Sequence, residues 1–144
     1  MKKTEKATST FKKGFSCSQA VFSTFAKELG ADENTVLKLS DAFGGGMGRM
    51  ALTCGAVTGA FMVFGLKYGR TSADDGEAKQ KTANLVREFA QKFEERNKSI
   101  VCKELLNCDI STDEGSKYAK ESNLTATICP KLVTDAVEIL EEIL

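Results

Sequence analysis

Histidine is absent from the 144 residues of this chain, and proline occurs only once, at Pro130. Without histidine the chain lacks the usual neutral-pH general base, a Cys-His catalytic dyad and a mixed Cys/His zinc site. With a single proline and no alternating run of β-branched residues, the sequence favours helices over strands. We therefore expect an all-α fold, and the length of the chain indicates one domain over residues 1–144.

An excess of charge and a long apolar run are also missing. Lys+Arg and Asp+Glu number 20 each, so no global field attracts nucleic acid or anionic lipid, and we expect no nucleic-acid partner. The longest uncharged stretch, residues 50–66, is shorter than the roughly 20 residues that a membrane-spanning helix needs. Because this stretch is rich in Gly, Ala and Thr, we expect a buried helix and no membrane span.

The N-terminal stretch MKKTEKATSTFKKGFSCSQA carries lysines but no continuous apolar segment of signal-peptide length. We therefore expect a cytoplasmic protein, in a compartment that keeps thiols reduced. Five cysteines in such a compartment are typical of reactive or metal-binding sulfurs rather than of a static disulfide framework. Their odd number leaves at least one sulfur outside any internal pair.

Helical periodicity and capping residues predict a compact bundle of about five to six helices around a central apolar helix rich in Gly and Ala. Ser16 and Asp32 are each placed to cap a helix, and Pro130 is placed in the first turn of the last one. The periodic apolar residues are Val36, Leu39 and Phe43 in one helix and Leu85, Phe89 and Phe93 in another. The expected helices cover residues 17–29, 33–43, 53–68, 76–97, 102–108 and 130–144.

The stretch GGGMGRMALTCGAVTG, residues 44–59, leads into the central helix. Its residues 46–51 fit the dinucleotide pattern G-x-G-x-x-A, but that motif works only between a strand and a helix, and here the preceding residues predict a helix. The glycines instead provide unhindered backbone N–H groups at a helix N-terminus, where a negative charge is favoured. We expect Gly45, Gly46 and Gly48 to bind a cofactor or other anion, or to surround the thiolate of Cys54.

Cys54 is the leading candidate for a reactive sulfur. It lies in the expected first helical turn, five residues after Arg49, and both features lower the pKa of a thiol. We predict that Cys54 titrates below the free-thiol value of about 8.5. The alternative is a small apolar residue packed in the core, because free cysteine is among the most buried residue types. Gly55 and Gly59 form a G-x-x-x-G that predicts close helix packing, within the chain or across a homodimer.

The other cysteines lie at or near expected helix ends. On one continuous helix Cys102 and Cys108 would be about 9 Å apart and could not form a disulfide, which needs Cα atoms within about 7 Å. Either the helix ends between them, or each faces a different partner. Cys129 directly precedes Pro130 and Cys17 follows Ser16, so both are expected at helix starts where a dipole stabilises a thiolate.

Four segments together resemble one family: CSQAV, FGGGMGRMALTCGAVTGAFMVFGLKYG, CKELLNCD and CPKLVTDAVEIL. They are similar to the C-GCAxxG-C-C family of small bacterial and archaeal proteins described as redox-active, from about Cys17 to the C-terminus. The resemblance places the signature cysteines on Cys54, Cys102, Cys108 and Cys129, with Cys17 at the recurrent CSQA position. It implies redox chemistry or an iron–sulfur centre at these sulfurs.

A related domain occurs in split-Soret cytochromes, which bind haem. This chain departs from them, because it has neither a C-x-x-C-H motif nor any histidine, and we expect no covalent c-type haem.

Three hypotheses follow from these observations. The first is a thiol-based redox protein in which Cys54 is the activated thiolate, Arg49 assists it, and Cys102, Cys108 or Cys129 resolves it, with a redox protein or a small thiol or disulfide as partner. The second is an electron-transfer or sensing module in which four of the five cysteines hold an iron–sulfur cluster. The third is a structural helical homodimer whose cysteines are core residues.

Overall fold

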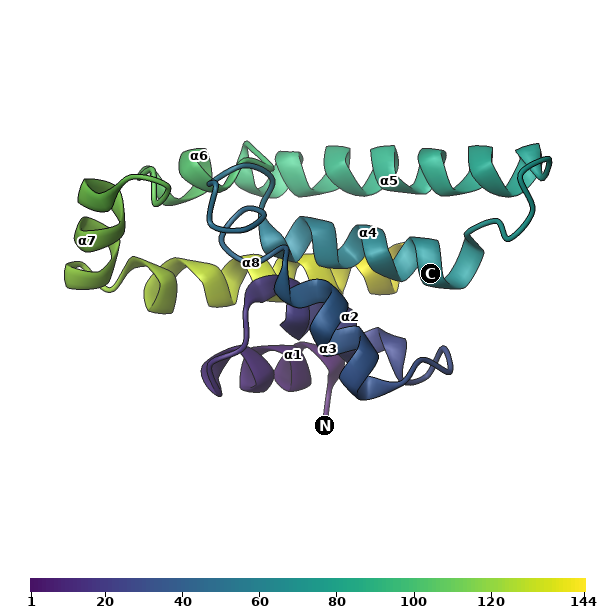
Figure 1. Cartoon of the computed structure of the whole chain (residues 1–144), viewed down its shortest axis with the longest axis horizontal. Coiled ribbons are helices and arrows are strands. Elements are labelled where there is room, and N and C mark those ends of the chain that lie inside the picture. Colours follow the sequence, from purple (N-terminus) through teal and green to yellow (C-terminus); the bar gives the residue numbers. More distant parts are fainter.

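The computed structural model describes residues 1–144 and contains eight helices and no strand (Figure 1). The predicted all-α fold is confirmed, but the predicted five to six helices are too few. The chain forms one antiparallel bridge outside the helices, between Thr53 and Val101. The helices are α1 (Lys3–Lys12), α2 (Cys17–Ala26), α3 (Glu33–Asp41), α4 (Gly55–Tyr68), α5 (Gly76–Asn97), α6 (Cys102–Leu106), α7 (Asp113–Glu121) and α8 (Leu124–Ile143).

The two helices missed by sequence reasoning, α1 and α7, are short and polar. In α1 only Ala7 is buried, and in α7 only Ala119 is buried. Short helices with so little apolar surface are marginal by themselves, so tertiary contacts decide whether they form. Helix α1 packs on α2 and α8, and α7 packs on α8. Thr112 caps α7 by accepting a hydrogen bond from the Gly115 N–H, at 2.9 Å.

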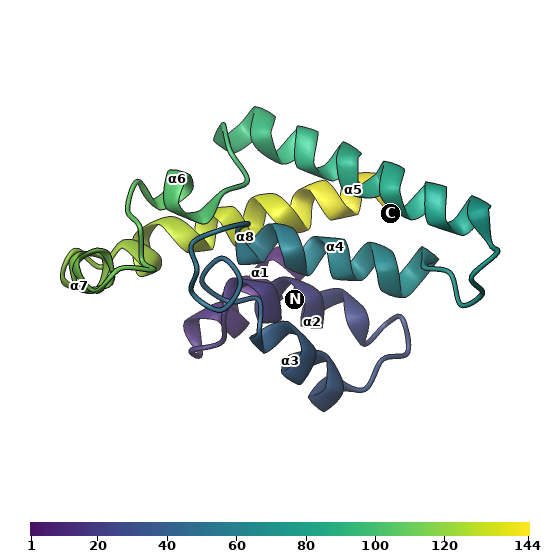
Figure 2. The same ribbon diagram turned by 45° about the horizontal axis from the view of Figure 1, so that its top comes forward.

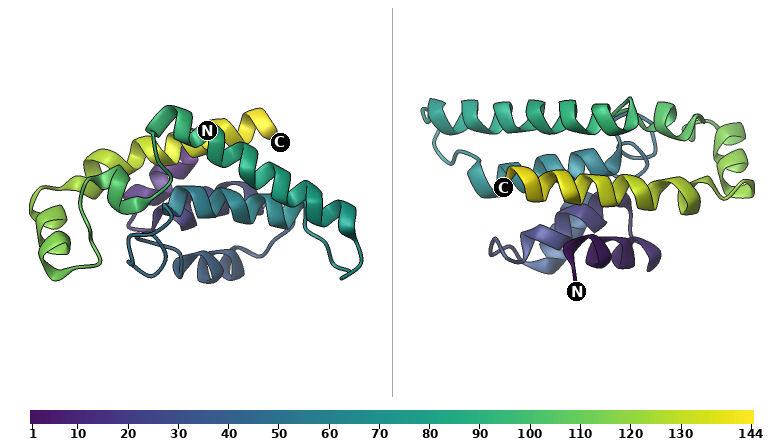
Figure 3. Two further views of the ribbon diagram at one scale, coloured as in Figure 1. Left: turned by 90° about the horizontal axis from the view of Figure 1, so that it is seen from above. Right: turned by 180° about the vertical axis from the view of Figure 1, so that it is seen from behind.

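The helices lie in three levels, visible from the front and from behind (Figures 1 and 3). Helix α5 covers one side of the pair formed by α4 and α8, and α1, α2 and α3 cover the other side. The apolar stripe predicted on α5 faces the core, where Phe89 lies against Phe64 at 6.0 Å and Phe93 at 5.9 Å between ring centroids. On α3 the apolar periodicity predicts the buried face less well, since Val36 is buried but Leu39 is 59% exposed.

The last helix begins earlier than predicted. Helix α8 starts at Leu124, so Pro130 lies inside it rather than in its first turn. Proline removes one backbone N–H and leaves the carbonyl of Ala126 without its usual helical donor, but the helix continues because its downstream face is packed in the core. The prediction that Cys129 stands at a helix start is therefore wrong, because Cys129 lies inside α8.

The N-terminal ends of α2 and α4 lie against each other because the residues that meet there have small side chains or none. A Cβ placed on Gly59 would lie 2.8 Å from the Ser18 carbonyl oxygen, and one on Gly55 would lie 3.0 Å from the Ser18 nitrogen and 3.3 Å from the Cys17 Cβ. The G-x-x-x-G therefore packs within the chain. Eight of the ten residues of α2 are buried, against eight of fourteen in α4, so α2 is the more buried of the two.

Helix α8 is also held to α5 by ionic contacts. Arg96 lies 2.8 Å from Glu138, 3.3 Å from Asp135 and 3.3 Å from Glu142, measured between guanidinium nitrogens and carboxylate oxygens. These contacts fix the element that carries Cys129. No helix is both long enough and apolar enough to span a bilayer.

Candidate functional site: a cavity lined by four cysteines

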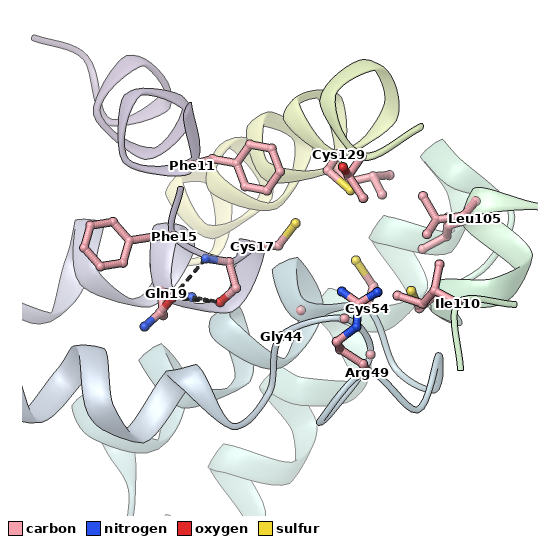
Figure 4. A pocket seen from close by; sticks show the side chains of 18 of the residues that line it. Phe11, Phe15, Cys17, Gln19, Gly44, Arg49, Cys54, Leu105, Ile110 and Cys129 are labelled. Atoms are coloured by element: carbon pink, nitrogen blue, oxygen red, sulfur yellow. Dashed lines mark hydrogen bonds between the residues drawn. The ribbon is translucent and has the colours of Figure 1, made fainter. Parts of the chain in front are cut away.

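A cavity of about 890 Å³ lies where the starts of α2, α4 and α6 meet the N-terminal half of α8 (Figure 4). Figure 2 shows the ribbons of α4 and α6 beside α8. Four of the five cysteines line it, each from a different helix or helix cap: Cys17, Cys54, Cys102 and Cys129. In Figure 4 the labelled side chains of Cys17, Cys54 and Cys129 all point toward this space. We call it the cysteine cavity.

Local capping places Cys17 at the cavity. It is the first residue of α2, directly after Ser16, whose hydroxyl accepts a hydrogen bond from the Gln19 N–H. The side-chain oxygen of Gln19 accepts in turn from the Ser16 N–H at 2.9 Å, which completes a capping box. The helix start predicted at Ser16 is therefore confirmed, and it places Cys17 in the first turn of α2.

The short antiparallel bridge brings two further cysteines side by side. The N–H of Cys54 donates to the Ile100 carbonyl at 2.7 Å, and the N–H of Cys102 donates to the Leu52 carbonyl. Cys54 is the N-cap of α4, one residue before the first helical residue, and Cys102 is the first residue of α6. Residues far apart in the sequence thus present their sulfurs to the same space.

The glycine-rich loop is a left-handed turn. Five consecutive residues, Gly45 to Arg49, have φ angles between 59° and 72°. Such a run is costly for residues with a Cβ, and Met47 and Arg49 adopt it as well as the three glycines. The backbone N–H groups of Gly45 and Gly46 make no hydrogen bond within the chain. Both residues and Gly48 belong to the lining of the cysteine cavity.

The close approach of this loop is to Cys102. A Cβ on Gly46 would lie 2.8 Å from the Cβ of Cys102 and 2.6 Å from the Leu52 nitrogen. The sequence predicts that this loop surrounds Cys54, and the amides that lower the pKa of Cys54 are those of Ala56 and Val57 in α4. The absence of a side chain at Gly46 is therefore required for packing on α6.

Cys54 is not an activated thiolate in this structure. Its side chain is almost fully buried, with 4% of the residue exposed, and burial raises its pKa to about 12. Hydrogen bonds from the Ala56 and Val57 amides oppose this shift, but the nearby sulfurs of Cys129 and Cys102 add to it. The prediction of a lowered pKa is therefore wrong, because the cost of burying a charge exceeds the benefit of the helix N-terminus.

Arg49 acts on a different cysteine from the one predicted. Its positive charge lowers the pKa of Cys102, although burial and the Cys129 sulfur still raise that pKa to about 11. The guanidinium also donates a hydrogen bond to the Ser116 hydroxyl at 3.0 Å, which ties the glycine loop to α7. Sequence distance suggested a pairing with Cys54, but the turn of the loop directs the side chain elsewhere.

Cys129 is the one cysteine of the cavity whose pKa is lowered. The cause is the neighbouring thiol of Cys17, which favours the charged form of Cys129. The same contact, together with burial, raises the pKa of Cys17 well above its usual value. One member of the pair is thus stabilised as a thiolate and the other as a thiol.

Cys108 does not join the other four sulfurs. Helix α6 ends at Leu106, and Asn107 follows in a left-handed conformation with φ 50°. This turn separates Cys102 from Cys108, as one of the two sequence hypotheses proposed. The Cys108 thiol donates to the Gly115 carbonyl at 3.2 Å and lies outside the cavity lining.

Several residues of the cavity wall were not predicted. Phe11 and Phe15 come from the N-terminal segment, Leu105 from α6 and Leu132 from α8. Gln19 also lines the cavity, and the S-x-x-Q capping pattern could have identified it. The apolar wall residues carry no local signal, because a cavity lining depends on which helix faces meet.

The family comparison agrees with these cysteine positions. The model of the family described as Putative redox-active protein (C_GCAxxG_C_C) matches residues 15–143, which include all five cysteines. The chain belongs to this family. That description is consistent with a redox role for this chain. Searches of the curated proteins and of the solved structures gave no match.

Proposed function

We propose that this protein carries out thiol–disulfide redox chemistry, with Cys129 as the attacking thiolate and Cys17 as the thiol that resolves it. The observation that carries the proposal is that Cys17 and Cys129 line the same cavity, with their sulfurs close enough that each shifts the pKa of the other. A thiolate is the reactive form of cysteine, and a second thiol in contact with it is what exchange requires. This assignment replaces Cys54 by Cys129 as the nucleophile.

The reaction is balanced when the electron acceptor is a small-molecule disulfide. The Cys129 thiolate attacks one sulfur of that disulfide, forms a mixed disulfide and releases one thiolate, which takes a proton from solvent. The sulfur of Cys17 then loses its proton to solvent, attacks Cys129 and displaces the second thiolate, which is also protonated. Two protein thiols become one disulfide, and one substrate disulfide becomes two thiols.

The remaining cavity thiols support this chemistry without taking part in it. Burial keeps Cys54 and Cys102 protonated at neutral pH, since it raises the pKa values of these thiols to about 12 and about 11. They therefore add no negative charge that would repel the Cys129 thiolate. A redox partner protein, a homodimer and a cytoplasmic location stay predictions from the sequence.

Mapping the disulfide tests the proposal. Reduced, metal-free protein is treated with oxidised dithiothreitol or cystine, the remaining thiols are blocked, and the linked peptides are identified by mass spectrometry. We expect a Cys17–Cys129 disulfide, and we expect Cys17→Ala to trap a mixed disulfide on Cys129. Cys108→Ala is the matched control, because this cysteine lies outside the cavity. A disulfide between other cysteines, or none, contradicts the proposal.

A second candidate is an iron–sulfur centre held by Cys17, Cys54, Cys102 and Cys129. It is supported by the convergence of these four on one cavity and by the free N–H groups of the glycine loop, which can donate to cluster sulfurs. No three of the cysteines form a group that fits a single metal ion. The sulfur ligands of a multi-iron cluster lie farther apart, because the cluster stands between them. Such a centre would supply one-electron transfer.

Anaerobic purification distinguishes the two candidates. An iron–sulfur protein is coloured, contains iron and sulfide, and loses both when Cys54 is replaced by alanine but not when Cys108 is replaced. A colourless anaerobic preparation without iron, which forms the Cys17–Cys129 disulfide, favours the thiol–disulfide candidate.

A further inference from the structure

We propose that the cysteine cavity binds a low-molecular-weight disulfide that carries carboxylate groups, and that Arg49 and the free amides of Gly45 and Gly46 recognise a carboxylate of that disulfide. This inference rests on the proposed function, because the bound disulfide is the electron acceptor for Cys129 and Cys17. It names the chemical class of the substrate.

The size of the cavity is the first argument. Two thiols that react only with the exposed disulfide of another protein need a shallow surface contact. The cavity measures about 890 Å³, which is within the range of about 300–1,000 Å³ that holds drug-sized ligands. A disulfide of two amino acids or short peptides fits such a volume.

The charge of the lining is the second argument. The charged residues that line the cavity are Lys12, Asp41 and Arg49, so cations outnumber anions. The N–H groups of Gly45 and Gly46 have no acceptor within the chain. Unpaired donors next to a guanidinium are a favourable place for a carboxylate, since hydrogen bonds to ionised groups are the strong ones.

The apolar part of the lining is the third argument. Cys54, of which only 4% is exposed, points its thiol into the cavity (Figure 4). The apolar side chains of Phe11, Phe15 and Leu105 also line the cavity, and they suit the sulfur and methylene portion of a disulfide.

Three probe disulfides of different charge test the inference. They are the dianionic dithiobis(nitrobenzoate), the neutral dithiodipyridine and the dicationic cystamine. The rate of Cys17–Cys129 disulfide formation is measured with each probe and divided by the rate of the same probe with a free small thiol. We expect a normalised preference of about tenfold for the dianion over the dication, because a single charge-assisted hydrogen bond is sufficient for that ratio.

Variants of Arg49 test whether this residue causes the preference for the dianionic probe. Arg49→Gln is expected to remove most of it, and Arg49→Lys to restore part of it. Ser116→Ala removes the hydroxyl that accepts from Arg49 but keeps the charge, and it is expected to retain the preference. Arg70→Gln is the matched remote control, since Arg70 donates a hydrogen bond to the Ala73 carbonyl and does not line the cavity.

The outcomes separate this inference from the proposed function. Equal normalised rates for the three probes, with the Cys17–Cys129 disulfide formed in each case, overturn the inference and leave the proposed function intact. An anion preference that survives Arg49→Gln overturns the role of Arg49. If no probe produces the Cys17–Cys129 disulfide, the proposed function and the inference fail together.

Discussion

Gly46 packs directly against Cys102, so closely that a Cβ on the glycine would lie 2.8 Å from the Cβ of the cysteine. The contact joins the left-handed glycine loop to the first residue of α6. It explains why a glycine is needed there in terms of packing as well as backbone angle. Gly48 shares the left-handed backbone, with φ 59°, but the nearest atom to its Cβ position is 4.0 Å away.

Replacing Gly46 and Gly48 separates the free-energy cost of a left-handed φ angle from the cost of a close packing contact. Gly48→Ala is expected to lower the free energy of unfolding by about 1–2 kcal/mol, the cost of left-handed backbone for a residue with a Cβ. Gly46→Ala is expected to cost a further 1–3 kcal/mol or so through overpacking against Cys102 and against the loop backbone at Ala51 and Leu52. Urea denaturation measures both. Equal losses for the two variants would show that these close contacts carry no energy.

Two glycines of α4 provide a second matched pair. Gly59→Ala places a methyl group 2.8 Å from the Ser18 carbonyl oxygen, whereas Gly65→Ala meets no atom within 4 Å. We expect Gly65→Ala to stabilise the protein by about 0.5–1 kcal/mol through helix propensity, and Gly59→Ala to destabilise it despite the same gain. Thermal unfolding of both variants is the measurement. A stabilising Gly59→Ala contradicts the close packing of α2 on α4.

The rate of alkylation should depend on pH through Cys129. Because the neighbouring thiol of Cys17 lowers the pKa of Cys129, this cysteine is expected to react first with iodoacetamide at neutral pH. Cys17→Ala removes that thiol and leaves only burial, which raises the pKa of Cys129, so its alkylation at pH 7 slows. Cys17→Ser keeps a donor and is expected to preserve the faster rate. Peptide mapping follows each site, and an unchanged rate in Cys17→Ala argues against the pairing.

Stability should fall at high pH because of Cys54. In the unfolded chain this thiol ionises near its ordinary pKa of 9.0, whereas in the folded protein burial raises the pKa to about 12. Above pH 9 the folded state therefore holds a proton that the unfolded state has lost, and the free energy of unfolding decreases as pH rises toward 12. Cys102, with its pKa raised to about 11, contributes in the same direction.

Cys54→Ala tests this sign. The variant is expected to lose less stability than the wild-type protein between pH 9 and 11, by up to about 1.4 kcal/mol per pH unit. Below pH 8 the two stability profiles should run parallel, which serves as the internal control. Guanidinium denaturation of the reduced proteins provides the data. Profiles that stay parallel through pH 11 would mean that Cys54 ionises as easily in the folded protein as in the unfolded one.

Local signals in the sequence determined much of the secondary structure. Ser16 and Asp32 cap helices where predicted, because a cap depends on a side chain and the backbone of the next few residues. The stripe of Phe89 and Phe93 predicted the buried face of α5, since helical periodicity is also local. The pairing of Gly55 and Gly59 predicted close packing, and the cysteine segments predicted the family.

Only the tertiary structure decided which sulfurs meet and which of them ionises. Cys17 and Cys129 are separated by most of the chain, and the packing of α2 and α8 brings them together. Cys54 has the helix position of a reactive thiol, yet the surrounding core makes its ionisation costly. Capping and periodicity act within a few residues and can be predicted from sequence, whereas burial and the distance between charges arise only when distant segments pack against one another.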